Sequence, residues 1–234
     1  VGLQVAKSLA LVNKTPLIGV NHLEGHLLAI RLSDHRPEPP FLGLIVSGGH
    51  TSLYFVKDYG QYERLATTRD DAAGEAYDKV AKLLGLPYPG GVPIDALAQQ
   101  GDPRAIKFPR ALRGDDLLEW SFSGLKTAVL HHVKKYGIPQ GQALADLAAS
   151  FQEAVADILT QKLMLGAKKS GAKSIVLCGG VAANSRLRAL AFERVSSANL
   201  TLYLPPKRLC TDNGAMIAVA GSITHQKGLR HEGR

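Results

Sequence analysis

The sequence predicts an α/β protein, because short apolar stretches typical of strands alternate with longer stretches of helical periodicity along its 234 residues. Hydrophobic residues make up 45% of the chain, which is ordinary for a folded globular protein. No apolar run approaches the roughly 20 residues that a membrane-spanning helix requires. The length suits one large domain or two small ones.

Each expected element follows from a local pattern. Residues 1–11 carry apolar side chains at helical spacing with no capping residue before them, so we expect a helix that begins inside a longer protein. Strands are expected where short apolar and β-branched runs occur, at residues 17–20, 41–46, 51–56 and 174–178. Helices are expected where apolar residues recur every three to four positions, at residues 72–84, 125–136, 142–170, 184–195 and 214–220.

The charge and the cysteine content indicate which partners and which cellular compartment to expect. The 28 basic and 20 acidic residues give a net charge of +8, which favours a polyanionic partner such as RNA but also suits a solvated surface. The two cysteines, Cys178 and Cys210, form no CxxC pair and no disulfide framework. A reducing cytoplasm is therefore the expected location.

A pair of histidines is a candidate metal site. His22 and His26 are four residues apart on an expected helix that Asn21 caps, so both imidazoles can reach one ion. The pair alone also fits surface or hydrogen-bonded core histidines. Glu24 follows His22 by two residues, roughly 200° around the helix, and should point away from such an ion. A zinc peptidase of the HExxH type places its glutamate directly after the first histidine.

Two glycine-rich turns could hold phosphate. Ser47, Gly48 and Gly49 join two expected strands, and glycines let backbone N–H groups approach an oxyanion, although they also suit a plain tight turn. Residues 179–184 form a strand–glycine–helix arrangement without the spacing of a Rossmann site or a P-loop. Asn184 and Asp212 each precede a helix, so each could be a cap or a ligand.

Acidic residues crowd one short helix. Asp71, Glu75 and Asp78 share one helical face, where their mutual repulsion requires a cation, a hydrogen-bond donor or a bound ligand nearby. Solvation is the default expectation for Asp70 and Asp71.

Seven motifs in order give the sequence a specific resemblance. They are HLEGH (22–26), VSGGHT (46–51), DAAGEAYDK (71–79), KLLGLPYPGG (82–91), FSGLKT (122–127), GGVAAN (179–184) and CTDNGAMIA (210–218). Together they resemble the TsaD family of tRNA N6-adenosine threonylcarbamoyltransferases. The resemblance implies an actin-like ATPase (ASKHA) fold, mainly its C-terminal lobe. It also implies three parts: a remnant of the N-terminal lobe (1–36), the C-terminal lobe (37–210), and a metal-ligand helix with a tail (211–234).

The resemblance further implies an activity and a site. The activity is transfer of a threonylcarbamoyl group from threonylcarbamoyl-AMP to N6 of adenosine 37 in tRNAs that read codons beginning with A. The metal ligands would be His22, His26 and Asp212, holding one divalent ion, with iron or zinc foremost. The adenylate or another adenine nucleotide would lie against Ile45, Val46, Ser47, Gly48, Gly49, Asp78, Gly91, Asp95 and Asn184. No general base is assigned.

Implied partners are tRNA, a paralogous scaffold subunit and a small ATPase subunit, with no membrane. Two other functions stay open at this level: a metal-dependent O-sialoglycoprotein endopeptidase, and a non-catalytic scaffold of the same fold. The position of Glu24 argues against the peptidase. A scaffold that had lost its metal ligands would not retain both histidines and the aspartate.

Overall fold

A five-stranded mixed sheet organises the computed structural model, which describes residues 1–112, 114 and 117–228. The strand order is β3-β2-β1-β4-β5. Pairing is antiparallel between β1 and β2 and between β2 and β3, and parallel from β1 to β4 and from β4 to β5. The strands are β1 (Phe41–Val46), β2 (Thr51–Asp58), β3 (Gln61–Thr67), β4 (Ser174–Cys178) and β5 (Thr201–Tyr203).

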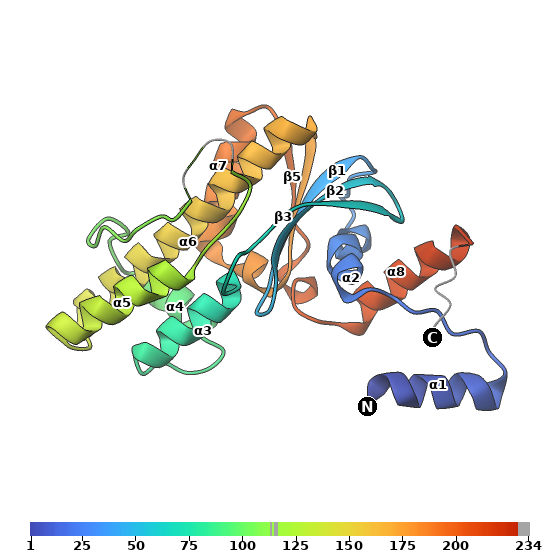
Figure 1. Cartoon of the computed structure of the whole chain (residues 1–234), viewed down its shortest axis with the longest axis horizontal. Helices are drawn as coiled ribbons and strands as arrows, with labels where there is room; N and C mark the ends of the chain where they lie inside the picture. The colour runs from blue at the N-terminus through green and yellow to red at the C-terminus, as the bar shows by residue number, and fades with distance from the viewer. Residues whose placement is uncertain (113, 115–116, 229–234) are drawn as a thin grey trace.

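Helices cover both faces of this sheet. Figure 1 shows α2 and α8 on one side and α3 to α7 on the other, with α1 beyond α2 and α8. The helices are α1 (Gly2–Asn13), α2 (His22–Leu28), α3 (Ala73–Leu83), α4 (Gly91–Ala98), α5 (Ser123–Tyr136), α6 (Gly141–Ser170), α7 (Ser185–Ser197) and α8 (Gly214–Gln226). Short 3₁₀ turns are η1 (Ala29–Leu32), η2 (Gly180–Ala183) and η3 (Lys207–Leu209). Among the described residues, no helix has the length and apolar character needed to cross a membrane.

The central strand β1 is buried on both faces, because successive side chains of a strand point in opposite directions. Leu42, Leu44 and Val46 enter the larger core, which α3, α5, α6 and α7 complete. Phe41 and Ile45 enter a smaller core on the side of α2 and η1. The sheet therefore separates two cores, and the ends of its strands are the places where side chains from both sides can meet.

Most expected elements are confirmed, one expected strand is corrected, and three elements of the structure were not expected. Residues 17–20 are not a strand, although they are apolar; they lie in a connection without regular structure. The sequence pattern does not predict β3, an edge strand whose alternation is masked by polar residues, or β5, which has only three residues. Nor does it predict α4, which follows a Pro- and Gly-rich stretch and itself contains Pro93.

The expected three-part division of the chain stays a prediction. The described part of residues 211–234 includes α8, which lies beside α2, whereas residues 229–234 of the expected tail lie outside the described residues. The first helix, α1, has no buried residue, so its apolar side chains at Leu3 and Leu9 are exposed.

Candidate functional site

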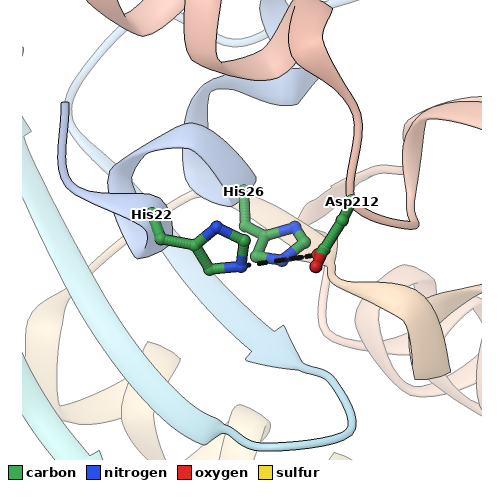
Figure 2. A group of neighbouring side chains, drawn as sticks. All are labelled: His22, His26 and Asp212. Atoms are coloured by element: carbon green, nitrogen blue, oxygen red, sulfur yellow. Dashed lines mark ion pairs between the residues drawn. The ribbon is translucent and has the colours of Figure 1, made fainter. Parts of the chain in front are cut away.

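Two helix N-termini bring the expected metal ligands together. Asn21 caps α2, accepting a hydrogen bond from the Leu23 N–H at 2.9 Å, and Asn213 caps α8 through the Met216 N–H at 2.9 Å. Because Asn213 is the cap, the Asp212 carboxylate is not used for capping. It points at both imidazoles instead (Figure 2), with Oδ1 3.1 Å from Nε2 of His26 and 3.4 Å from Nε2 of His22.

A close helix contact fixes this geometry. A Cβ on Gly25 would lie 2.9 Å from Cδ1 of Ile217 and 3.4 Å from Cγ of Met216, so the absence of a side chain lets α2 approach α8. The glycine of the HLEGH motif thus has a packing role between the two helices that carry the cluster. The sequence shows the glycine but does not indicate that it packs against Ile217 and Met216 of α8.

The three donors differ in exposure. His26 is 1% exposed, whereas the side chains of His22 and Asp212 are 48% and 75% exposed. Burial and the neighbouring His22 lower the pKa of His26, and the nearby Asp212 carboxylate opposes that shift. Within the described residues, Nδ1 of the buried His26 has no hydrogen-bond partner, whereas its Nε2 faces the Asp212 carboxylate at 3.1 Å. Unprotonated imidazole nitrogen beside a carboxylate is the donor chemistry that iron and zinc accept.

Two of the donor spacings, those from Asp212, fit one ion. One donor atom from each of the three residues lies within 4.8 Å of the other two. Donors about 2.1 Å from one ion are roughly 3.0 to 3.4 Å apart in octahedral or tetrahedral arrangements, close to the two distances from Asp212. Glu24 is not part of this cluster. Its Oε1 accepts a hydrogen bond from the Tyr62 hydroxyl at 2.7 Å, which confirms that it points away from the histidines.

A cavity of about 550 Å³ lies on the other side of Thr211, and none of the three cluster residues lines it. Its walls come from the β1–β2 hairpin, α3, α4, η2 and the loop before α8. Of the nine residues expected to bind the adenylate, five line it: Gly48, Asp78, Gly91, Asp95 and Asn184. Thr211 also lines the cavity, and it directly precedes Asp212 in the chain, so the metal-ligand cluster adjoins the cavity wall.

The other four expected residues do not line this cavity. Ile45 and Val46 have fully buried side chains that belong to the two cores, so their side chains cannot reach a ligand. The Ser47 hydroxyl accepts a hydrogen bond from the His50 N–H at 3.1 Å, which closes the turn around Gly49. Ser47 therefore shapes the hairpin. Of the turn residues Ser47, Gly48 and Gly49, Gly48 alone lines the cavity.

Contacts with α3 hold the hairpin in place. The Thr51 hydroxyl accepts a hydrogen bond from the Ala73 N–H at 2.9 Å, and the Ser47 carbonyl accepts one from the Gly74 N–H at 3.2 Å. A Cβ at Gly74 would lie 2.6 Å from the Ser47 carbonyl oxygen and 2.7 Å from the Gly48 Cα. The helix can approach the hairpin this closely because position 74 has no side chain.

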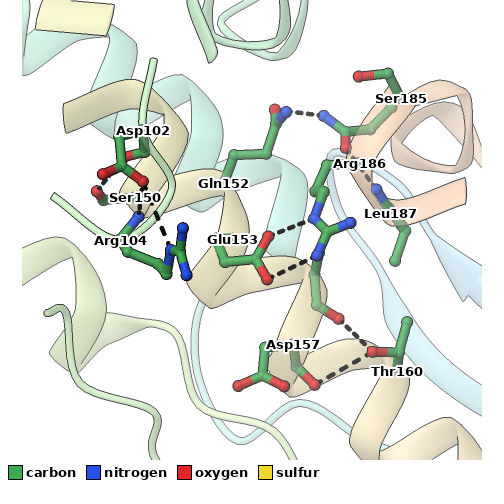
Figure 3. A network of polar contacts seen from close by, with 12 residues as sticks. Asp102, Arg104, Ser150, Gln152, Glu153, Asp157, Thr160, Ser185, Arg186 and Leu187 are labelled. Atoms are coloured by element: carbon green, nitrogen blue, oxygen red, sulfur yellow. Dashed lines mark hydrogen bonds and ion pairs between the residues drawn. The ribbon is translucent and has the colours of Figure 1, made fainter. Parts of the chain in front are cut away.

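The opposite wall is a polar network around Asp95. Its carboxylate accepts hydrogen bonds from Gln152 Nε2 at 3.0 Å, Asn184 Nδ2 at 3.2 Å and the Ser185 hydroxyl at 2.6 Å. Asn184 also caps α7 through the Leu187 N–H and donates to Gln152 Oε1 at 2.7 Å, so the cap and ligand interpretations are compatible. Figure 3 shows Gln152 of α6 and Leu187 of α7, two of the residues that Asn184 contacts. Asp95 is thereby fixed as an acceptor at the cavity surface.

The acidic residues in α3 and just before it are balanced by groups of the protein itself. Lys79 Nζ lies 2.7 Å from both Asp71 and Glu75, and Asp78 accepts a hydrogen bond from the Gly90 N–H at 2.7 Å. Asp70 is not simply solvated: it accepts hydrogen bonds from the backbone N–H groups of Phe122 and Ser123 at the start of α5. Lys79 stands four residues after Glu75, a spacing that could have identified the balancing cation from sequence.

Comparisons with known proteins agree over almost the whole chain. A family model described as "tRNA N6-adenosine threonylcarbamoyltransferase" (TsaD) matches residues 1–219. A protein of that name from Anaeromyxobacter dehalogenans is 60% identical over 98% of this chain and 69% of its own length. One from Syntrophus aciditrophicus is 54% identical over 99% of this chain and 68% of its own length.

Solved structures show the same fold at low sequence identity. A crystal structure of T. kodakarensis HypF matches with a TM-score of 0.74 and 17% identity over 97% of this chain, which spans 39% of the HypF chain. A phosphate- and nucleotide-bound HypF structure matches with a TM-score of 0.68 and 16% identity over 94% of this chain and 37% of its own. These likenesses support the α/β fold.

Proposed function

The chain belongs to the TsaD family of tRNA N6-adenosine threonylcarbamoyltransferases, and on this premise we propose that it transfers threonylcarbamoyl from its adenylate to N6 of a tRNA adenosine. The observation that carries this proposal is the position of the His22, His26 and Asp212 cluster beside the 550 Å³ cavity. The cavity wall contains five residues expected to bind an adenylate, and Thr211 connects the wall to the cluster.

The cluster is proposed to hold one divalent transition-metal ion, iron or zinc. Three observations support it: the two donor spacings from Asp212, the buried His26 Nε2 that faces this carboxylate, and a set of two imidazoles with one carboxylate. When bound, such an ion supplies Lewis acidity that neutralises phosphate charge and polarises a carbonyl.

The residues of the chain position the reactants. Asp95, held by Gln152 and Ser185, can accept hydrogen bonds from ribose hydroxyls. Gly48 and Gly91 expose backbone that can lie close to the ligand. In the reaction, the adenine N6 forms a C–N bond to the carbamoyl carbon, the C–O bond to phosphate breaks, AMP leaves and N6 loses a proton. Exocyclic adenine nitrogen is a weak nucleophile, so orientation contributes much of the rate.

The proposed partners follow from the substrate and the charge. The net charge of +8 suits contact with the tRNA backbone. A paralogous scaffold subunit and a small ATPase subunit are proposed as protein partners, and the cytoplasm as the location. Neither alternative function is favoured. Glu24 is engaged by Tyr62 instead of facing the cluster, and the chain retains all three ligands that a non-catalytic scaffold would lose.

A reconstituted transfer assay tests the proposal. The chain would be combined with the partner subunits, the adenylate-forming enzyme, threonine, bicarbonate, ATP and unmodified tRNA, with the Anaeromyxobacter relative as the positive control. We expect threonylcarbamoyl-adenosine in the tRNA digest by mass spectrometry. Asp212→Asn should abolish it, whereas Glu24→Gln should retain activity within about threefold, because Glu24 lies outside the cluster. Activity that survives Asp212→Asn but not Glu24→Gln would contradict the assignment.

A further inference from the structure

The described lining of the cavity contains two acidic residues and one basic residue. Asp78 and Asp95 are carboxylates, and each already accepts hydrogen bonds from the protein. Lys207 is the one basic side chain among the described lining residues. Its ammonium group has no ion-pair partner in the described part of the chain. A cation that lines a cavity and has no ion-pair partner is available to an anionic ligand.

The backbone that carries Lys207 is firmly anchored. Lys207 begins η3, and the same short loop continues through Thr211 to Asp212. Arg188 of α7 holds this loop against η2, because its guanidinium donates to the Pro205 carbonyl at 2.8 Å and to the Ala182 carbonyl at 2.6 Å. One loop therefore presents both a lysine to the cavity and a carboxylate to the two histidines.

We propose that Lys207 binds the phosphoryl group of an adenylate in this cavity. This inference rests on the proposed function and deepens it, because it orients the ligand. The phosphoryl end lies at the loop of residues 205–212, where the lysine supplies positive charge beside the metal-ligand cluster. The adenosine end lies toward α3 and α4, where the Asp78 and Asp95 carboxylates would repel phosphate but accept hydrogen bonds from hydroxyl groups.

The neighbouring residue provides a matched control. Arg208 follows Lys207 on the same 3₁₀ turn and is also exposed, but it does not line the cavity. Lys207→Gln and Arg208→Gln each remove one positive charge, and the two positions are adjacent in the chain. A general effect of net charge would weaken anion binding in both variants, whereas direct contact would weaken it only in the first.

The test compares AMP with adenosine, which differ only by the phosphoryl group. Isothermal titration calorimetry at fixed low ionic strength would measure both ligands on the wild-type chain and on each variant. We expect Lys207→Gln to weaken AMP binding by about tenfold, as for loss of a charge-assisted hydrogen bond, and to leave adenosine binding unchanged. Arg208→Gln should change neither affinity by more than about twofold, and Lys207→Arg should retain most of the preference for AMP.

The outcomes separate this inference from the proposed function. Retention of the full preference for AMP in Lys207→Gln would overturn the role of the lysine while leaving an adenylate-binding cavity intact. Equal loss of AMP affinity in both glutamine variants would also overturn it, since net charge would then explain the effect. A wild-type chain that binds neither ligand would contradict the proposed function, and the inference would fail with it.

Discussion

Replacement of Gly74 by alanine is expected to destabilise the protein, although the same change usually stabilises a helix. Alanine in place of helical glycine contributes about 0.5 to 1 kcal/mol. At position 74 the new methyl carbon would lie 2.6 Å from the Ser47 carbonyl oxygen, 2.7 Å from the Gly48 Cα and 2.8 Å from the Gly48 nitrogen. These are backbone atoms that cannot rotate away, so α3 or the hairpin must move.

Forced displacement of packed groups costs about 1 to 3 kcal/mol, which exceeds the gain in helix propensity. We expect Gly74→Ala to lower the free energy of unfolding by about 1 to 2 kcal/mol, a fall in melting temperature of roughly 2 to 8 °C for a chain of this size. The displaced Gly48 also lines the cavity, so AMP affinity should fall at the same time.

Gly124 provides the control. It is the second residue of α5, as Gly74 is of α3, and a Cβ there would meet nothing within 4 Å. Gly124→Ala should leave AMP binding unchanged and keep or raise the melting temperature. Urea unfolding and calorimetric titration measure the two quantities. If Gly74→Ala were as stable as Gly124→Ala and bound AMP normally, the close approach of α3 to the hairpin would be refuted.

Three further perturbations test the site and its surroundings. His26→Ala should lose bound iron or zinc in elemental analysis after metal loading and dialysis, whereas His131→Ala, which changes an exposed histidine on α5, should retain it; equal metal content would contradict the assigned ligands. Burial raises the pKa of Asp157, but Arg194 and Arg110 outweigh that effect and hold it below its usual value. Its contribution to stability is therefore present above about pH 4 and lost as pH falls through the folded-state pKa. Urea unfolding should show a steeper loss of stability toward pH 3 for the wild type than for Asp157→Asn, and parallel profiles would contradict this. Tyr62→Phe should leave metal content unchanged, because its hydroxyl bonds Glu24 and not the cluster; loss of metal would show that Glu24 orients the histidines.

The sequence by itself predicted the elements whose patterns are local. The buried strand 41–46, the long helix from residue 142 and the caps Asn21 and Asn184 all depend on nearby residues, so periodicity and capping rules were sufficient. The orientation of Glu24 also followed from helix geometry alone. Strand β3 was missed because an edge strand needs few apolar residues, and the apolar residues 17–20 show that local hydrophobicity does not by itself make a strand.

Only the tertiary structure decided how distant segments combine. It placed Asp212 within 3.4 Å of two histidines 186 and 190 positions earlier in the chain, and it assigned the helix cap to Asn213 instead. It also separated Gly48, which lines the cavity, from Ile45 and Val46, whose side chains fill the cores. Lys207 is a candidate ligand because the fold brings its loop to the cavity, where Arg188 anchors the loop beside η2. Such contacts depend on the packing of helices across the sheet, and one-dimensional spacing carries no information about which loops that packing brings together.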